Sequence, residues 1–509
     1  MQLGFVIDHS RCIGCHACTV ACKAENDVPL GNFRTWVKYT ESGSFPEVRR
    51  SFAVLRCNQC TQAPCVEICP VHALEKRADG IVDVDPERCI GCKSCMQGCP
   101  YDALYLNDES GTAEKCHFCA HRTEIGLAPA CAVVCPTEAI IPGDFDDPGS
   151  AVAELRKTGR LNSRKPEAGT GPNVLYREAS PAGLNPLETQ AGEGFLWANQ
   201  LPGIQFDAQV FAAAEKQASA RTVYDVEHPP LWGGKVSAYL WTKSVSAGLF
   251  LAGLWFLPSL GSGAAPGLWR LGLGLSLAFL ALTTVLLVTD LKRPERFLFI
   301  LRHGNWNSWL TRGSVVLMGY GALLSTWLAI SVLAVRIDGW VSALLAATTA
   351  LAALATAVYT AWLFAQAKGR VLWMRRGLAL ELAIHAALAG SAAWTLLILA
   401  WGDSGHAKLG VLRVLAMAFT AGQLVLQWAG PKMAPEKREE EYARVYRLIQ
   451  AGPFATRHKW TMVAMAVSIP LFAVPGLPVA WGFAAVMILA ALALEQDTLV
   501  RAGQALPIS

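Results

Sequence analysis

Charged side chains are scarce in this chain of 509 residues: Asp, Glu, Lys and Arg make up 17% of it, against 53% hydrophobic residues. Soluble domains usually carry about 25% charged residues, so the composition argues against an ordinary soluble protein. The net charge is only +4, which lacks the strong basic excess of a nucleic-acid-binding protein. The amino terminus has no charged stretch followed by an apolar run, and we therefore expect no secretory signal there.

The charges that are present divide the chain into two parts and a middle segment. Residues 1–150 contain 13 Lys and Arg against 20 Asp and Glu, whereas residues 236–509 contain 22 against 11. Residues 151–235 are balanced, with 9 of each sign. An acidic front and a basic, apolar back predict a soluble head on a membrane base and no nucleic-acid partner.

Cysteine is abundant, and all sixteen cysteines lie in four short groups in the first 135 residues. The groups are Cys12, Cys15, Cys18 and Cys22; Cys57, Cys60, Cys65 and Cys69; Cys89, Cys92, Cys95 and Cys99; and Cys116, Cys119, Cys131 and Cys135. The last three groups end in Cys-Pro, and three close cysteines followed by a fourth is the bacterial ferredoxin spacing. Soft thiolates suit iron–sulfur centres. At four ligands per cubane, the spacing predicts four [4Fe–4S] clusters.

Disulfides and structural zinc are the alternatives to iron–sulfur clusters. Disulfide frameworks belong to small secreted domains, and this chain shows no secretory signal. Zinc held by four thiolates needs only CxxC pairs, whereas these groups add a third cysteine and, in three cases, a Cys-Pro step. The spacing therefore favours clusters, and metal analysis would distinguish them from a zinc-stabilised membrane scaffold.

Over residues 1–150 this spacing resembles the four-cluster electron-transfer subunit of the dimethyl-sulfoxide-reductase family. Some members of that family have tryptophan in place of one cysteine, but no cysteine is replaced here. The resemblance implies an α+β ferredoxin-like iron–sulfur domain in which the first group pairs with the fourth and the second with the third. The implied ligand sets are Cys12, Cys15 and Cys18 with Cys135; Cys22 with Cys116, Cys119 and Cys131; Cys57, Cys60 and Cys65 with Cys99; and Cys69 with Cys89, Cys92 and Cys95.

The rest of the chain predicts a linker and then a membrane domain. Residues 151–235 are rich in Pro, Gly, Ala and charge, and we expect a long linker that lies against a partner subunit, with disorder as the alternative. From residue 236 onward, apolar runs are long enough to cross a hydrocarbon core of about 30 Å. They predict an all-α transmembrane bundle of about eight helices, near 236–258, 267–289, 314–335, 339–366, 378–401, 409–429, 460–475 and 477–496. Residues 433–452 predict either an amphipathic helix at the membrane surface or a solvated charged loop.

Basic residues are concentrated in the loops that would lie on the same side as the head. With an even number of spans, these are the loops after the second, fourth and sixth, which hold Lys292, Arg293, Arg296, Arg302, Arg312, Lys368, Arg370, Arg375, Arg376, Lys432, Lys437, Arg438, Arg444, Arg447, Arg457 and Lys459. The opposite loops and adjoining helix ends hold only Arg270, Arg336, Lys408 and Arg413. The positive-inside rule therefore predicts a bacterial-type inner-membrane protein whose head faces the cytoplasm. The alternative is a periplasmic head, exported together with a partner that carries a twin-arginine signal.

Several stretches within residues 225–509 resemble the polysulfide-reductase-type membrane anchors: HPPLWGGKVSAYLWTKSVSAG at 228–248, DLKRPERF at 290–297, YTAWLFA at 359–365 and EQDTLVRAGQALPIS at 495–509. The resemblance implies a quinone-reactive anchor without haem, fused here to the iron–sulfur head. The positions of the histidines independently argue against haem, because a bis-histidine haem needs facing histidines within helices. Only His385 lies deep in a predicted span, with His303, His406 and His458 in predicted loops.

Polar side chains inside or beside the spans are the candidates for quinone and proton chemistry, because a charge at the bilayer centre costs roughly 2.5–3.5 kcal/mol. A quinone that exchanges electrons with the head must bind at the helix ends facing it, where the candidates are Tyr239, Lys243, Asp290, Arg293, His303 and Trp306. His303 is the first choice because histidine titrates near neutral pH. Glu381 and His385 are four residues apart and share a helix face, where they either carry protons or satisfy each other between helices.

Together these features predict the electron-transfer and membrane-anchor subunit of a molybdopterin oxidoreductase complex. By resemblance, a separate molybdopterin catalytic subunit docks on the head, which agrees with the lack of a nucleophile–base or phosphate-loop motif in this chain. Its substrate is expected to be a sulfur compound such as sulfite, and quinone oxidation or reduction is the only chemistry expected on this chain itself. The alternative function is a redox-driven proton-translocating membrane module that uses Glu381 and His385.

Overall fold

Two four-stranded sheets form the frame of the head in this computed structural model, which describes residues 1–197, 220–255, 266–335, 337–401 and 406–509. The first sheet runs β8 (Ile140–Asp144), β1 (Leu3–Asp8), β10 (Val174–Arg177) and β9 (Leu161–Asn162). The second runs β11 (Thr189–Trp197), β12 (Ala220–Asp225), β2 (Thr35–Ser42) and β3 (Arg49–Arg56). Two hairpins complete the strands, β4 (Leu74–Lys76) with β5 (Val82–Val84) and β6 (Leu104–Asn107) with β7 (Thr112–Lys115).

Short helices connect these strands, and most of them begin inside a cysteine group. They are α1 (Ala17–Glu25), α2 (Pro64–Ile68), α3 (Ser94–Gly98), α4 (Ala120–Thr123), α5 (Ala130–Val133), α6 (Ala151–Lys157), η1 (Pro166–Ala168), α7 (Pro181–Leu184) and η2 (Pro186–Glu188). Phe5, Val37 and Phe118 are buried together with cysteine side chains in one core cluster. The head therefore combines strands and helices around its thiols, as the predicted α+β fold requires.

The described residues from 151 to 225 are folded into the head, so the predicted linker requires correction. β10 pairs in parallel with β1, placing Val174 opposite Phe5, and β12 pairs antiparallel with β2, placing Ala220 opposite Ser42. Both strands provide hydrogen-bond partners for backbone groups of β1 and β2 that would otherwise lie at open sheet edges. The head thus extends to Asp225. Residues 198–219 of the predicted linker lie outside the described residues.

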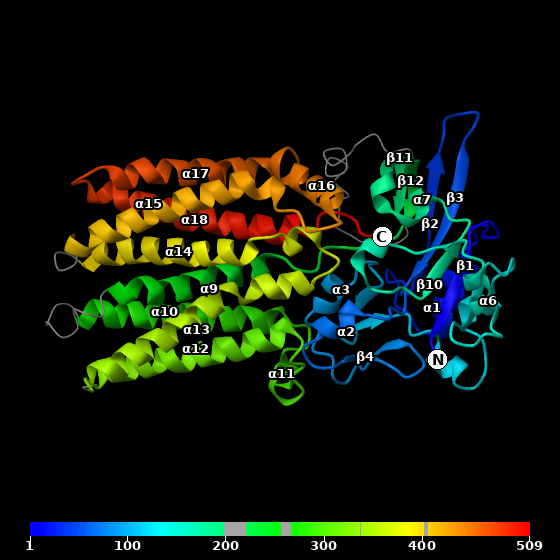
Figure 1. The fold of residues 1–509 in the computed structure, drawn as a ribbon, viewed down its shortest axis with the longest axis horizontal. Coiled ribbons are helices and arrows are strands. Elements are labelled where there is room, and N and C mark those ends of the chain that lie inside the picture. The colour runs from blue at the N-terminus through cyan, green and yellow to red at the C-terminus, as the bar shows by residue number, and fades with distance from the viewer. Residues whose placement is uncertain (198–219, 256–265, 336, 402–405) are drawn as a thin grey trace.

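Eight helices of 19 residues or more follow in the described part of the chain, and Figure 1 shows them side by side with the head at one end. They are α9 (Gly234–Gly253), α10 (Pro266–Asp290), α12 (Trp309–Val332), α13 (Gly339–Gln366), α14 (Leu378–Trp401), α15 (His406–Ala429), α17 (Ala455–Ala473) and α18 (Pro478–Ala502). Each overlaps one of the predicted spans, although residues 256–258 of the first prediction lie outside the described residues.

Six of these helices are long and apolar enough to cross a membrane: α10, α12, α13, α14, α15 and α18, within the residues described. α9 is less apolar because it contains Lys243 among several hydroxyl and aromatic side chains. α17 is less apolar because Arg457, His458 and Lys459 fall in its first turns. The chain is therefore a multi-pass membrane protein, with six spans established by length and composition rather than the eight predicted.

Short helices join the long ones at the end of the bundle that faces the head (Figure 1). They are η4 (Pro294–Arg296), α11 (Phe299–Arg302), η5 (Val371–Met374), η7 (Gly430–Lys432) and α16 (Glu439–Gln450). α16 falls within the predicted amphipathic stretch and buries Tyr442, Val445 and Leu448. Its apolar face packs against α17 and α18 of the protein itself, which excludes the solvated-loop alternative.

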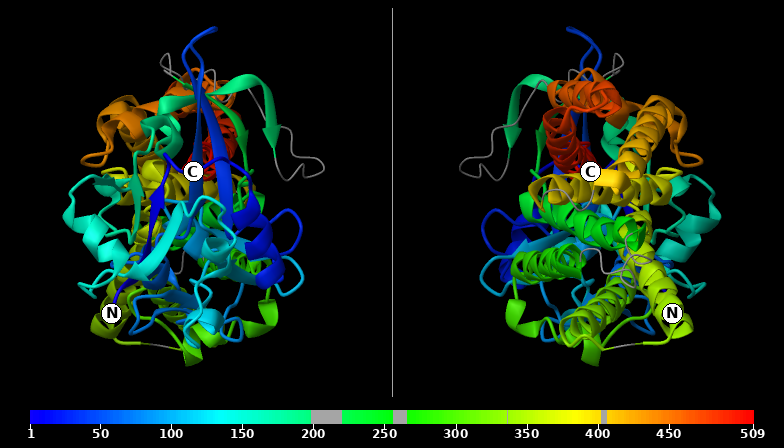
Figure 2. Two further views of the ribbon diagram at one scale, coloured as in Figure 1. Left: turned by 90° about the vertical axis from the view of Figure 1, so that its right-hand side faces the viewer. Right: turned by 90° about the vertical axis from the view of Figure 1, so that its left-hand side faces the viewer.

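Backbone hydrogen bonds hold the head on the bundle. Asn305 N donates to Pro70 O at 2.9 Å, and Gly369 N donates to Gln97 O at 3.1 Å. Gly369 has to be small, because a Cβ atom there would lie 2.5 Å from Cys99 O. Figure 2 shows the ribbon viewed from both ends of the long axis. The cysteine motifs of the head are thus placed directly over the helix ends.

Candidate metal centres and an adjoining cavity

Grouped by their electrostatic neighbours, the sixteen thiols fall into four sets of four. Thiols of one set are close enough to interact electrostatically, as Cys12 does with Cys135 and Cys22 with Cys116. The first set is Cys12, Cys15, Cys18 and Cys135, and the second is Cys22, Cys116, Cys119 and Cys131. The third set is Cys57, Cys60, Cys65 and Cys99, and the fourth is Cys69, Cys89, Cys92 and Cys95.

The donor sets fit iron–sulfur clusters. All sixteen cysteines are free of disulfide bonds. One small cavity is lined by all four thiols of the second set, and another by all four of the fourth set. Convergence of four soft thiolates on one enclosed point is the arrangement that a cubane cluster requires.

Burial makes several of these thiols, among them Cys18 and Cys92, poor acids until a metal replaces the proton. It raises the pKa of Cys18 to about 11 and that of Cys92 to about 12, because the thiolate loses its hydration in the interior. Backbone N–H groups also donate hydrogen bonds to sulfur: Ala139 N donates to Cys135 Sγ at 3.2 Å and Ala113 N to Cys89 Sγ at 3.4 Å. Folding around metal therefore couples ligand deprotonation to cluster binding.

A much larger cavity lies where the fourth set meets the membrane helices. Its volume is about 420 Å³, within the range of small-molecule sites. α9, α10 and α12 supply most of its apolar lining, including Leu277, Leu280 and Leu317. Polar atoms are confined to a few side chains, among them Tyr239 and Asp290.

Cys92 lines this large cavity and also the small cavity enclosed by the fourth set. Lys93, the next residue, forms an ion pair of 2.8 Å with Asp290, whose side chain lines the large cavity. The motif residues and α10 are therefore held against each other at this point. Sequence reasoning missed the pair, because residues 197 positions apart give no local pattern.

The six predicted quinone residues are not all brought together. Tyr239 and Asp290 line the large cavity, whereas Lys243 does not line it and donates a hydrogen bond to Thr360 Oγ1. The other three lie outside the lining. Arg293 donates to Ser110 O, His303 packs against Phe299, and Trp306 is 63% exposed.

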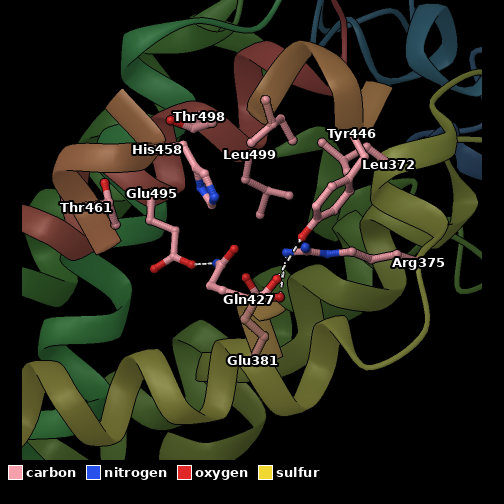
Figure 3. A pocket seen from close by; sticks show the side chains of 11 residues that line it. Leu372, Arg375, Glu381, Gln427, Tyr446, His458, Thr461, Glu495, Thr498 and Leu499 are labelled. Atoms are coloured by element: carbon pink, nitrogen blue, oxygen red, sulfur yellow. Dashed lines mark hydrogen bonds and ion pairs between the residues drawn. The ribbon is translucent and has the colours of Figure 1, made fainter. Parts of the chain in front are cut away.

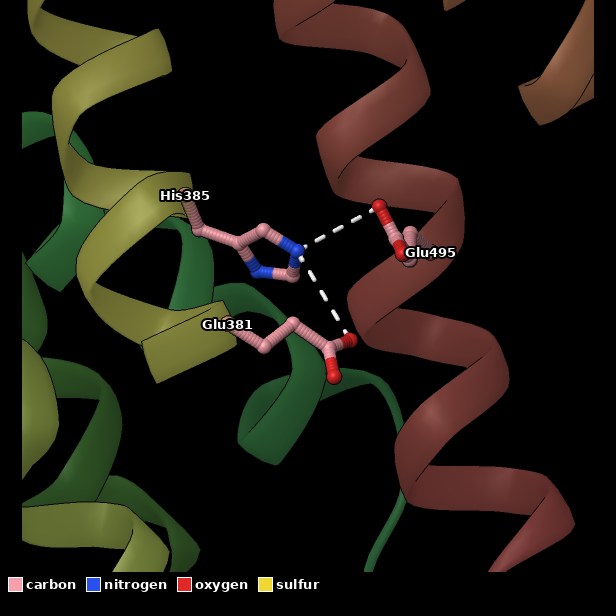
Figure 4. Close-up of side chains that lie close together, drawn as sticks. All are labelled: Glu381, His385 and Glu495. Carbon is pink, nitrogen blue, oxygen red and sulfur yellow. Dashed lines mark ion pairs between the residues drawn. The ribbon is translucent and has the colours of Figure 1, made fainter. Parts of the chain in front are cut away.

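A buried cluster of charged side chains lies in the second half of the bundle. His385 Nε2 is 3.9 Å from Glu381 Oε1 and 3.3 Å from Glu495 Oε2, as Figure 4 shows. Arg375 pairs with Glu381 at 2.5 Å, and Gln423 donates to Glu495 at 2.6 Å. Glu381 and His385 were predicted from their spacing, but Glu495 was missed because it comes from α18.

A small cavity adjoins this cluster and leads toward α16 and α17 (Figure 3). Its volume of about 30 Å³ is enough to hold a water molecule. Gln427, Tyr446 and His458 are among its lining residues. His458 was expected in a loop, but it lies in the first turn of α17. The loop assignment of His458 was therefore wrong, because the basic triplet that contains it continues the helix.

Comparison with protein families divides the chain at the same place as the fold. Residues 48–145 match the family described as a 4Fe-4S dicluster domain, which covers the second, third and fourth cysteine groups. Residues 223–506 match the family described as polysulphide reductase, NrfD.

Individual relatives match a shorter part of the chain. One of the subunits of tetrathionate reductase in Salmonella typhimurium is 46% identical over 201 residues, which are 38% of this chain and 80% of that protein. The arsenate respiratory reductase iron–sulfur subunit ArrB of a Shewanella species is 37% identical over 224 residues, 35% of this chain and 96% of that protein. The thiosulfate reductase electron transfer subunit PhsB of Salmonella typhi is 43% identical over 175 residues, 33% of this chain and 88% of that protein.

Proposed function

Because this chain belongs to the polysulphide reductase NrfD family and carries a 4Fe-4S dicluster domain in its head, we propose that it transfers electrons between a separate molybdopterin catalytic subunit and the membrane quinone pool. The quinone is an exchangeable substrate, and its oxidation or reduction is the only reaction assigned to this chain. When bound, [4Fe–4S] clusters supply one-electron transfer. The residues described above hold those clusters and shape the quinone site.

Four clusters in series are supported by the adjacency of the thiol sets. Cys18 of the first set interacts with Cys131 of the second, and Cys65 of the third set interacts with Cys95 of the fourth. Lys115 interacts with Cys116 of the second set and with Cys57 of the third, which supports adjacency of these two sets. The order first, second, third, fourth thus leads through the head to the membrane cavity.

The observation that carries the proposal is that Cys92 lines both the cavity of the fourth set and the large membrane cavity. A quinone head group in the large cavity would lie beside a cluster ligand, with its isoprenoid tail among Leu277, Leu280 and Leu317. Tyr239 and Asp290 are the polar residues proposed to bind it. Lys243, which does not line the cavity, is proposed to act through its hydrogen bond to Thr360. Arg293, His303 and Trp306 are left out because they do not line the cavity.

The catalytic partner is proposed to dock where the first set reaches the surface. Cys15 is exposed, and Ile13 and Val20 beside it are 57% and 64% exposed. Exposed apolar side chains grouped in this way mark interaction surfaces. The named relatives belong to tetrathionate, arsenate and thiosulfate reductases, and we propose a sulfur compound, such as sulfite, as the substrate of the partner.

Purification of the full chain with its associated proteins tests this proposal. We expect about sixteen iron and sixteen sulfide per chain, and a large partner that contains a molybdopterin. Substantial zinc with little iron and sulfide would contradict the cluster assignment and favour the zinc-stabilised scaffold. A complex with iron but without any pterin-containing partner would contradict the assignment of the catalytic subunit.

The membrane arrangement proposed here has eight spans, with α9 and α17 crossing beside the six apolar helices. The basic loops after α10, α13 and α15 then lie on the side of the head, which favours the cytoplasm; Arg336, on the opposite side, lies outside the described residues. A fluorescent protein that folds only in the cytoplasm, fused ahead of Met1, is expected to fluoresce. A dark but expressed fusion would support the alternative, a periplasmic head exported with a partner.

Proton translocation is a second candidate function, and the buried Glu381, His385 and Glu495 favour it. When both carboxylates are ionised, Arg375 balances only one of them, and a proton on His385 would balance the other. We expect that combining Glu381→Gln with His385→Ala in membrane vesicles stops proton uptake while quinone reduction continues. If both processes continue unchanged, the buried Glu381 and His385 have no role in proton movement.

A further inference from the structure

The guanidinium of Arg56 is buried between two thiol sets. Its Nη1 donates a hydrogen bond to Cys131 Sγ at 3.1 Å, and its charge also acts on Cys116 and Cys18. The first two cysteines belong to the second set and Cys18 to the first. The guanidinium carbon lies 4.5 Å from the ring centre of Phe5, and the side chain is 0% exposed. Arg56 therefore reaches the ligands of two metal centres from one buried position.

A buried guanidinium needs a negative partner, because an unpaired charge in the protein interior is strongly destabilising. Among the described residues, Arg56 forms no ion pair with a carboxylate, and its Nε and Nη2 atoms have no hydrogen-bond partner. The negative groups that act on it are the thiolates of the two sets. The metal-bound cysteines are therefore its counter-charge.

Lys115 has the same kind of position between the second and third sets. It is 2% exposed, and its ammonium donates to the backbone oxygens of Val82 and Cys116, the latter at 2.8 Å. Its charge acts on Cys57 and Cys65 of the third set, on Cys116 of the second and on the carboxylate of Asp83. Arg56 thus lies where the first and second sets meet, and Lys115 lies where the second and third sets meet.

We propose that Arg56 and Lys115 are the counter-ions of the iron–sulfur clusters and raise their reduction potentials, Arg56 at the first and second sets and Lys115 at the second and third. This inference rests on the proposed series of four clusters. Reduction potentials of such clusters depend on net charge and on hydrogen bonds to sulfur. Reduction adds one electron and forms no bond, so the reduced cluster carries one more negative charge. A fixed cation stabilises that form more than the oxidised one.

The same cations reduce the repulsion between neighbouring clusters. Two reduced clusters in a low-dielectric interior repel each other, which lowers the potential of whichever is reduced second. A cation placed between them attracts both. Arg56 and Lys115 are therefore expected to keep adjacent clusters reducible together.

Redox titration of the purified full-length protein, followed by electron paramagnetic resonance, tests this inference. The variants are Arg56→Gln, Arg56→Lys and Lys115→Gln, with Lys38→Gln as the matched control. Lys38 is also buried in the head, but its ammonium pairs with Asp225 at 3.5 Å. Iron and sulfide are measured first in every variant.

Arg56→Gln is expected to lower the reduction potentials of the clusters at the first and second sets. Lys115→Gln is expected to lower those at the second and third sets. The potentials of Arg56→Lys and Lys38→Gln are expected to stay near those of the wild type. Unchanged potentials in both Gln variants at full iron content would overturn this inference but leave the four-cluster proposal intact. A wild-type protein without four clusters would overturn the proposal itself. If Arg56→Gln loses iron, retention of iron in Arg56→Lys supports a role for the positive charge. Equal loss of iron in both variants contradicts that role.

Discussion

The ammonium of Lys93 lies 2.8 Å from the carboxylate of Asp290, and this ion pair joins a cysteine motif of the head to the end of α10. Lys93 follows a ligand of the fourth set, and Asp290 lines the large membrane cavity. One contact therefore connects the proposed last cluster to the proposed quinone site. Mutation can separate the contribution of this ion pair to stability from the contribution of the Asp290 carboxylate to quinone turnover.

Asp290→Asn is expected to slow quinone turnover by on the order of tenfold to 100-fold, because the amide cannot exchange protons with a quinone. Loss of the carboxylate also leaves Lys93 without its ion-pair partner, which costs about 1–3 kcal/mol of stability. Steady-state quinone assays and thermal unfolding measure the two effects. Asp108→Asn is the control, because Asp108 pairs with Lys292 at an exposed position; an equal loss of turnover in both variants would contradict a role for Asp290 in the cavity.

Gly321 lines the large cavity on α12, whereas a Cβ atom at Gly319 on the same helix would meet nothing within 4 Å. Gly321→Leu is expected to raise the KM for quinone or lower the rate by about tenfold, because the side chain occupies space needed by the substrate. Gly319→Leu makes the same chemical change on the other side of α12 and is expected to leave turnover unchanged. Similar kinetics in the two variants would show that the quinone binds elsewhere.

Burial lowers the pKa of His9 from its ordinary value of 6.5 to about 4. The unfolded chain then binds a proton that the folded head does not, so stability is lost as the pH falls from about 6.5 to about 4, by on the order of 2–3 kcal/mol. His9→Phe retains a ring against Tyr176, which packs edge-on with His9 at 5.2 Å. Thermal unfolding of both proteins across this range is expected to show the variant gaining relative stability as the pH falls. A constant difference would contradict the depressed pKa, and acid damage to the clusters affects both proteins alike.

Arg375→Gln is expected to destabilise the bundle by about 3–5 kcal/mol, because Glu381 loses its partner in a buried site. Arg375 and Glu381 are 7% and 4% exposed at their side chains. The double variant Arg375→Gln with Glu381→Gln removes both charges and is expected to recover most of the loss. Chemical unfolding in detergent measures the free energies of unfolding of this double-mutant cycle. If the losses of stability of the single variants add up in the double variant, the pair is not coupled.

The sequence predicted those features that depend on local spacing. The four cysteine groups fold into loops followed by short helices, whereas the division of each group between two sets was implied by the family resemblance. The long helices overlap the predicted spans for the same reason, because apolar length is a local property. The proximity of Glu381 to His385 also follows from a four-residue step on one helix.

Contacts between distant segments were not predictable from those patterns. β10 and β12 were assigned to a linker because residues 151–235 are rich in Pro, Gly, Ala and charge, yet β1 and β2 provide strand partners that no local signal reveals. Glu495 reaches His385 from a different helix. His303 was preferred as a quinone residue for its chemistry, but its side chain does not line the cavity, although Ile300 and Leu301 of the same segment do.

The most direct test of the central claim starts from the purified protein with its clusters reduced by dithionite and the excess reductant removed. Oxidised quinone is then added without oxygen, and cluster reoxidation is followed by electron paramagnetic resonance. We predict rapid reoxidation in the wild type and in Gly319→Leu, with marked slowing in Gly321→Leu. Clusters that remain reduced in the wild type at full iron content would contradict a connection between the fourth set and a quinone in the large cavity.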